Sequence, residues 1–413
     1  MLTLGDVLVH TNKQPSIDIA KDMIKRNFSI IELLAAFHVL LLMLSYTGVK
    51  VGHYFNYLAY VTGAVLLAVV IDCYGLNLKV VVFLITMALI YYLCLFASGY
   101  GSYSIPLKIT LQYTPLSVFF LKRKKLNPVI WGCVVAFIVC IVELFWMISS
   151  DKYILFEEIS RNYISLFMIF SMFIITLVFE QKCVNIPIVF PLMFAVLCIL
   201  GIGRAGMVSG ILYFGFIVLY RTYKVPNDKY RKIKSLLMVL ALFLVIVFAL
   251  FQEKQIVEVI KARFFSNAYE ARNDGRMRIY KAYLNGMFAS FRNIIWGIKP
   301  NSVAGQLNFE IGDNLHSSYI QLHSMFGLFG IIGFVSLITR GIRQIIKDNR
   351  YQSLCLLLTY LIRIASDYAI CGFLTDVICL YYIFLPILCK RRIVDENRRR
   401  NRIFGITESI SQQ

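Results

Sequence analysis

The feature that most constrains this chain is a series of long apolar runs that contain few charged residues. Hydrophobic residues make up 59% of its 413 residues and charged residues only 16%. Soluble domains have about 45–50% apolar and about 25% charged residues. The excess apolar surface does not fit inside a soluble core, which excludes an ordinary soluble enzyme and a disordered chain. The composition therefore predicts an all-α, polytopic integral membrane protein.

The apolar runs predict about twelve membrane-spanning helices, because a helix needs about 20 apolar residues to cross the hydrocarbon. The runs lie near residues 28–47, 53–72, 79–97, 104–121, 129–149, 164–180, 185–203, 206–220, 235–251, 318–339, 353–372 and 374–389. The fourth run is the weakest, since it contains Lys108, Gln112 and two prolines. The last two runs are separated by almost nothing, around Gly372 to Asp376.

A single long hydrophilic segment interrupts this membrane domain. Residues 1–251 hold the first nine predicted spans, and residues 318–390 hold the last three. Between them lies a loop at 252–317, and residues 391–413 form a basic tail. We expect this loop to be extracytoplasmic and to contain amphipathic helices, because 276–296 repeats apolar residues at helical spacing.

The distribution of basic residues predicts the orientation in the membrane. The chain has 42 Lys and Arg against 23 Asp and Glu, a net charge of +19. Basic clusters occupy every second gap between the runs, around residues 13–26, 122–125, 221–234, 340–350 and 390–402. By the positive-inside rule these gaps and both termini are cytoplasmic. Nucleic-acid binding is excluded, because the cations are dispersed over loops and form no basic domain.

The long loop departs from this pattern, since it carries more cations than anions although we expect it outside. Long loops translocate largely regardless of charge, so the predicted orientation stands. A basic surface outside the membrane suits an anionic ligand, and a solvated cap of mixed charges is the alternative. The helix at 276–296, which Gly297 and Pro300 end, fits both the membrane interface and packing on the bundle.

His316 is the candidate for proton transfer. It lies in the sequence GDNLHSSY, where the loop ends and a span begins, with Asn314 as an accessory polar residue. A neutral imidazole at this outer boundary can accept a proton. His323 lies seven residues further on, on nearly the same face of the expected helix, where packing or a hydrogen bond between helices is its expected role.

Two arginines are candidates for binding phosphate. Arg204 lies in a glycine-rich break between two spans, where backbone N–H groups and the positive end of the next helix favour an anion. Arg276 follows Gly275, which permits a tight turn, and Arg272 and Arg278 are close by. Guanidinium groups bind phosphate bidentately, so this cluster suits a diphosphate. Ion pairs with neighbouring carboxylates are the alternative.

Arg363 and Asp367 form an i, i+4 pair inside the eleventh run, where charges either neutralise one another or mark a functional site. Glu143 in the fifth run is similar but has no partner nearby in sequence. No cysteine or histidine spacing typical of a metal site occurs. The sequence contains no Walker motif and no HExxH motif, which argues against an ATPase and a zinc protease. It also contains no GxSxG motif and no Asp-x-Asp motif, which argues against a nucleophile-elbow hydrolase and a metal-dependent nucleotide-sugar transferase.

The order of these motifs resembles that of the O-antigen polymerase and O-antigen ligase superfamily of bacterial surface-polysaccharide enzymes. The motifs that carry the resemblance are an arginine at a span junction, a Gly-Arg pair early in a large outer loop, a Trp-Gly patch and a histidine at the loop's end: Gly203–Gly206, Gly275–Arg276, Trp296–Gly297 and His316. The resemblance covers about residues 200–340 best. Relatives often have Asn after this histidine, whereas Ser317 follows it here.

The resemblance implies a GT-C-like membrane glycosyltransferase of the bacterial inner membrane. Such an enzyme polymerises lipid-linked oligosaccharide repeat units of O-antigen or capsule type on the periplasmic face. Its donor is a glycan on undecaprenyl diphosphate, and it needs no nucleotide, metal or other cofactor. A chain-length regulator protein is a further partner that the resemblance leaves open.

By the same resemblance, His316 accepts or orients the proton of the attacking sugar hydroxyl, and Arg204 and Arg276 stabilise the leaving diphosphate. Arg272, Arg278, Arg363, Asp367 and Asn314 are accessory candidates. Two alternatives stay open. One is an O-antigen ligase that transfers the glycan to lipid A–core, and the other is a flippase or other transporter of lipid-linked oligosaccharides.

Overall fold

The computed structural model describes residues 30–46, 49–75, 77–148, 154–156, 159–160, 164–201, 204–224, 233, 237, 267–300, 302 and 315–388. The described part is helical apart from one small antiparallel hairpin. This confirms the all-α prediction. The basic tail 391–413, Asn314 and the predicted run at 235–251 apart from residue 237 lie outside the described residues.

The helices follow one another along the chain with short connections. The first is Ile30–Leu44. The remaining elements are α2 (Val49–Tyr74), α3 (Leu78–Ser98), α4 (Ile105–Lys108), the π-helix η1 (Ile109–Tyr113), α5 (Thr114–Lys122), α6 (Pro128–Ile148), β1 (Ile154–Phe156), β2 (Ile159–Ser160), α7 (Ile164–Gln181), α8 (Val189–Leu200), α9 (Arg204–Lys224), α12 (Asn267–Phe288), α13 (Phe291–Trp296), α14 (Ser318–Lys347), α15 (Tyr351–Ala365) and α16 (Asp376–Leu388).

Among the described residues, five helices are long and apolar enough to cross a membrane: Gly52–Tyr74, Leu78–Ser98, Ile164–Gln181, Ala205–Tyr223 and Ser318–Lys347. Five further apolar helices are shorter over the residues whose side chains are described, namely Ile30–Leu44, Pro128–Glu143 of α6, Val189–Leu200, Tyr351–Ala365 and Asp376–Leu388. Each predicted run within the described part therefore contains helix. The length expected of a complete span is reached in five cases.

The weakest predicted run, 104–121, is helical but not regular. Pro106 and Pro115 each lie in the first turn of a helical piece, where proline is tolerated. Between these pieces the backbone forms a π-turn, and the carbonyl of Gln112 accepts a hydrogen bond of 2.8 Å from His38 Nε2. The Gln112 amide donates to Asn56 Oδ1 at 2.9 Å. Gln112, one of the polar residues that weaken the run, is therefore paired inside the bundle.

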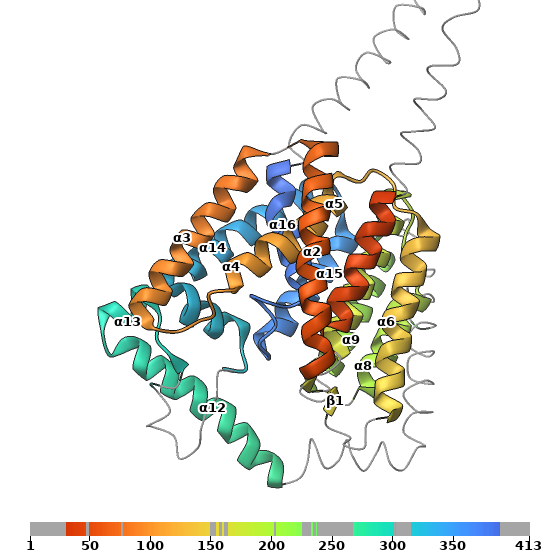
Figure 1. Cartoon of the computed structure of the whole chain (residues 1–413). Helices are drawn as coiled ribbons and strands as arrows, with labels where there is room; N and C mark the ends of the chain where they lie inside the picture. Colours follow the sequence, from red (N-terminus) through yellow and green to blue (C-terminus); the bar gives the residue numbers. More distant parts are fainter. Residues whose placement is uncertain are drawn as a thin grey trace, which may run out of the picture.

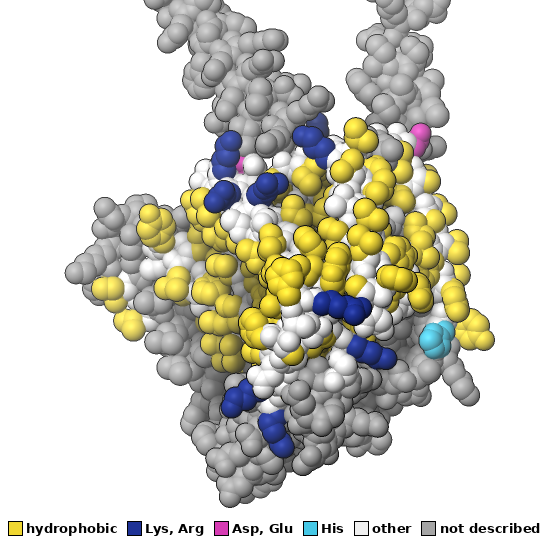
Figure 2. Space-filling view, turned by 90° about the vertical axis from the view of Figure 1, so that its left-hand side faces the viewer, with side chains coloured by type: hydrophobic (Ala, Val, Ile, Leu, Met, Phe, Trp, Pro, Cys, Tyr) yellow, Lys and Arg dark blue, Asp and Glu magenta, His cyan; other side chains and the backbone are white. Residues whose placement is uncertain are grey.

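The core of the bundle lies around α7, which packs against α6, α8, α9 and α15. In the apolar stretch of α7, 78% of the residues are buried. In the apolar stretches of α2 and α3, only 22% of the residues are buried. Helix α3 forms one edge of the molecule in Figure 1. Exposed apolar side chains such as Val61, Ile85 and Phe96 cover these two helices. Figure 2 shows a broad band of hydrophobic side chains, with lysines and arginines both above it and toward its lower edge. This surface suits contact with lipid hydrocarbon.

Candidate functional site

His316 lies just before α14, in a left-handed backbone conformation with φ of 52°. Ser317 is the N-cap of α14, so His316 and His323 do not share a helix, and that expectation was wrong. The His316 carbonyl accepts a hydrogen bond of 2.8 Å from the hydroxyl of Tyr280 on α12. A left-handed conformation is uncommon outside glycine, and Tyr280 helps to hold it here. The start of α14 is thereby attached to the helix that carries Arg276.

The segment between α15 and α16, residues 366–375, is not helical although it is largely buried. The carboxylate of Asp376 accepts hydrogen bonds from three backbone N–H groups, at 3.0 Å from Cys371, 2.6 Å from Gly372 and 3.0 Å from Phe373. Irregular backbone is tolerated at membrane depth only where protein surrounds it or where it lines a cavity. We call residues 366–375 the broken segment.

Ser318 connects the start of α14 to the broken segment. Its hydroxyl donates to the Asp367 carbonyl at 2.7 Å and accepts from the Ala369 N–H at 2.9 Å. Ser318 is itself fully buried. His316, two residues earlier in the chain, therefore lies beside the broken segment and its charged residue Asp367.

The predicted pair of Arg363 and Asp367 forms an ion pair with 2.9 Å between Nη1 and Oδ2. Arg363 is 0% exposed. Its Nε donates to Ser165 Oγ in the first turn of α7 at 2.6 Å. A buried charge requires a partner, and the pair meets that requirement while joining α15 to α7 and to the broken segment.

The first turn of α9 approaches the same serine. A Cβ added at Gly206 would lie 3.2 Å from Ser165 Oγ and 3.1 Å from its Cβ, so a residue without a side chain permits this close approach. Arg204 is the first residue of α9, two residues before Gly206. Its side chain lies outside the described part of the structure.

Arg276 lies inside α12, a continuous helix from Asn267 to Phe288, so the tight turn expected at Gly275 was wrong. Arg276 and Tyr280 are one turn apart and share a face of this helix. Arg278 is exposed. The side chains of Arg272 and Arg276 lie outside the described part.

His323 belongs to the attachment of α13 to α14. Its Nε2–H donates to the Ile294 carbonyl at 2.9 Å, which leaves Nδ1 to accept from the Tyr283 hydroxyl at 2.8 Å. Ser324 Oγ donates to the Ile298 carbonyl at 2.7 Å. The expected structural role of His323 agrees with these contacts.

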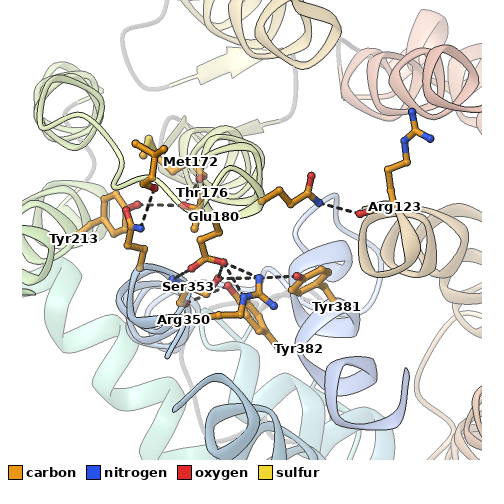
Figure 3. A network of polar contacts seen from close by, with 12 residues as sticks. Arg123, Met172, Thr176, Glu180, Tyr213, Arg350, Ser353, Tyr381 and Tyr382 are labelled. Atoms are coloured by element: carbon orange, nitrogen blue, oxygen red, sulfur yellow. Dashed lines mark hydrogen bonds and ion pairs between the residues drawn. The ribbon is translucent and has the colours of Figure 1, made fainter. Parts of the chain in front are cut away.

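A second buried polar cluster joins the far ends of α7 and α15 (Figure 3). Glu180 forms an ion pair with Arg350, with 2.7 Å between Oε2 and Nη2, and accepts from the Ser353 N–H and hydroxyl at 2.9 and 2.7 Å. Arg350 also donates to the Tyr381 hydroxyl at 2.8 Å. The carboxylate and the guanidinium satisfy each other, so this cluster acts as a structural clamp.

The described structure thus brings together four parts of the chain that are far apart in sequence. They are the start of α9, the start of α14, the broken segment after α15 and the middle of α12. Tyr280, Ser165 and Ser318 make the connections, and the sequence analysis did not predict a role for them. The local sequence around these residues does not indicate the contacts, because each contact joins residues at least 36 positions apart.

No group of three or more His, Cys, Asp or Glu that could hold a metal ion occurs among the residues whose placement is described. Comparison with known proteins gave no match to a family model, to a curated protein or to a solved structure. Membership of the O-antigen polymerase and ligase superfamily therefore stays a prediction that rests on the motifs, and the function is argued from the site itself.

Proposed function

We propose that this chain is a membrane glycosyltransferase that polymerises lipid-linked oligosaccharide repeat units of O-antigen or capsule type. It transfers the growing glycan from undecaprenyl diphosphate to a sugar hydroxyl of another lipid-linked unit. The reaction takes place on the outer face of the bacterial inner membrane. The chain crosses this membrane about twelve times, with both termini in the cytoplasm.

One observation carries this proposal, namely that the segments with the candidate residues meet. Gly206, two residues after Arg204, packs on Ser165, whose hydroxyl binds Arg363. Arg363 pairs with Asp367, and the Asp367 carbonyl binds Ser318, two residues after His316. These residues come from four regions of the chain. A single site that holds a histidine and cationic segments is what transfer from a diphosphate requires.

The position of the basic residues favours an outward-facing site. Lys122 ends α5 and Lys347 ends α14, while His316 and Arg204 lie at helix starts. In Figure 1, α12 and α13 lie at the end of the bundle opposite α5. Because basic residues favour the cytoplasmic side, the end with α12, α13 and the site is the outer one.

The proposed reaction follows from the residue types. The acceptor hydroxyl attacks the anomeric carbon, its C–O bond forms as the bond to the diphosphate breaks, and the hydroxyl proton passes to the His316 imidazole. Proton transfer of this kind contributes about 100- to 10,000-fold in rate. Arg204 and Arg276 stabilise the negative charge on the departing undecaprenyl diphosphate. Arg272 and Arg278 add positive charge along α12.

The test is chain extension by purified protein in lipid nanodiscs supplied with lipid-linked repeat units, followed by gel analysis of product length. Arg276→Ala should lower extension about tenfold or more, since a charge-assisted contact contributes about 1.5–3 kcal/mol. Lys281→Ala, which removes an exposed cation from the same helix, is the matched control and should extend normally. Arg276→Lys should also be poor, because Lys cannot bind phosphate bidentately.

Three outcomes would contradict the proposal. Near-normal product lengths with Arg276→Ala would remove the diphosphate role of that arginine. Transfer to lipid A–core without any extension would favour the ligase, and movement of lipid-linked units across the bilayer without new glycosidic bonds would favour the transporter.

A further inference from the structure

A cavity of about 310 Å³ lies between α3, α14 and α16, away from α9. Its walls are aromatic and aliphatic, with Phe83, Met87, Ile90, Phe326, Phe334 and Leu380 among the lining residues. An apolar cavity of about 150 Å³ is known to bind benzene. By that measure, this cavity has room for roughly a dozen carbon atoms, which is one segment of a hydrocarbon chain.

The cavity opens between α3 and α14, both of which are long and apolar enough to cross a membrane. Phe329 lines it and is 48% exposed, and the exposed Thr86 lines it from α3. Gly333 also lines the cavity and leaves open space there, because a Cβ added to it would meet nothing within 4 Å. A molecule that enters here comes from the bilayer.

The far wall of the cavity is formed in part by the broken segment and by the start of α16. Ile370 and Cys371 of the broken segment line it, and so does Asp376 at the start of α16. The Asp376 carboxylate already accepts three backbone hydrogen bonds. A hydrocarbon chain in the cavity therefore contacts the broken segment, which also contains Asp367.

Lys108 lies next to this wall. It precedes Ile109, which lines the cavity, and it is close enough to Asp376 to interact electrostatically. Among the described residues, its ammonium group has no hydrogen bond and no carboxylate within 4 Å. A lysine at membrane depth costs about 2.5–3.5 kcal/mol, and an anionic ligand offsets that cost.

We infer that this cavity is a second lipid site, in which one segment of an isoprenoid chain lies between α3 and α14 and Lys108 binds the phosphate of that lipid. The inference rests on the proposed function and deepens it. Joining two lipid-linked units requires two lipid phosphates in the protein at once. The arginine-bearing helices α9 and α12 serve the donor, and the cavity holds the carrier of the acceptor unit.

Photo-crosslinking with a photoreactive isoprenyl diphosphate tests the site in the full-length protein in nanodiscs, with labelled peptides identified by mass. We expect labels on α3, α14 or α16. Gly333→Leu fills the cavity and should lower this labelling about tenfold or more, as should Lys108→Gln, which removes a charge-assisted contact. Gly132→Leu is the matched control, because Gly132 is an exposed helical glycine of α6 that also has open space around it.

The two proposed sites are separable in the same experiment. Labelling of the cavity should persist in Arg276→Ala and be restored in Lys108→Arg. In the extension assay, Lys108→Gln should lower the preference for a lipid-linked acceptor over a soluble oligosaccharide acceptor by about tenfold. Equal labelling by an isoprenyl alcohol that lacks phosphate would overturn the role of Lys108.

Unchanged labelling or unchanged extension in Gly333→Leu would overturn the cavity site while leaving the polymerase proposal intact. Cavity labelling that depends on Lys108 in a protein that never extends a glycan would support the site and contradict the polymerase proposal.

Discussion

His316 and His323 are seven residues apart, and the structure gives them different surroundings. His316 precedes α14 beside the broken segment, whereas both ring nitrogens of His323 are engaged by Tyr283 and Ile294. His316→Ala should therefore lose about 100- to 10,000-fold in activity with little change in stability. His323→Ala should lose about 1–3 kcal/mol of stability, because it leaves buried polar groups unpaired.

The measurement is polymer length at matched membrane levels, together with the melting temperature of the purified variants. Equal activity in the two variants, or full activity in His316→Ala, would remove His316 from the mechanism. In that case only the arginine part of the proposed chemistry would remain.

Tyr280 provides a second prediction at the scale of a residue. Its hydroxyl binds the His316 carbonyl at 2.8 Å, so Tyr280→Phe should release the backbone that positions the imidazole and lower the turnover number severalfold. Tyr382→Phe removes a comparable bond, from a tyrosine hydroxyl to the Ser353 carbonyl at 3.1 Å, at the opposite end of the bundle. Steady-state kinetics should show a fall in turnover for Tyr280→Phe alone. A matching fall in both variants would indicate a general loss of folding.

At the scale of elements, the junction of α13 with the kink in α14 depends on Gly327. This glycine has φ of 59°, and a Cβ added to it would lie 1.9 Å from the Ile295 carbonyl oxygen. Gly327→Ala should therefore push α13 away from α14 and lower the melting temperature, since backbone strain and a lost contact each cost about 1–3 kcal/mol. Gly215→Ala in α9, where a Cβ would meet nothing within 4 Å, should be neutral or stabilising. Equal melting temperatures for the two variants would contradict this account of the junction.

Most helices could be predicted from the sequence, because hydropathy and length are properties of a local window. The broken segment could not be predicted in the same way. Its short polar stretch resembles a turn between spans, and its buried backbone is stable only because Ser318, about 50 residues away, and Asp376 bind it.

At Gly275 the sequence suggests a turn, but the structure has a helix. A glycine locally favours a turn, yet it lies inside α12, where Ile279 and Tyr283 pack against Ile298 and Leu315. Tertiary packing of the apolar face outweighs the cost of about 1 kcal/mol for a glycine within a helix. The candidate residues themselves were predictable from residue type and position. Their convergence was not, since it depends on contacts between distant segments.

At the scale of the whole molecule, α7 and α15 run antiparallel and are joined at both ends. Ser165 and Arg363 form one junction, and Glu180 with Arg350 and Ser353 forms the other (Figure 3). The site lies at the first junction and the structural clamp at the second. The two ends of the bundle therefore carry different polar residues. The orientation of the chain in the membrane decides on which side the candidate site lies.

That orientation can be measured with single cysteines and an impermeant maleimide in intact spheroplasts. Asn285→Cys lies on an exposed position of α12, at the end of the bundle with the site, and should react from outside. Lys125→Cys lies in the basic cluster after α5 and should react only after the membrane is permeabilised. The wild-type chain, which has ten cysteines of its own, gives the background signal. Reversed labelling would place His316 and the broken segment on the cytoplasmic side, where a lipid-linked donor on the outer leaflet cannot reach them, and the proposed polymerase reaction would be ruled out.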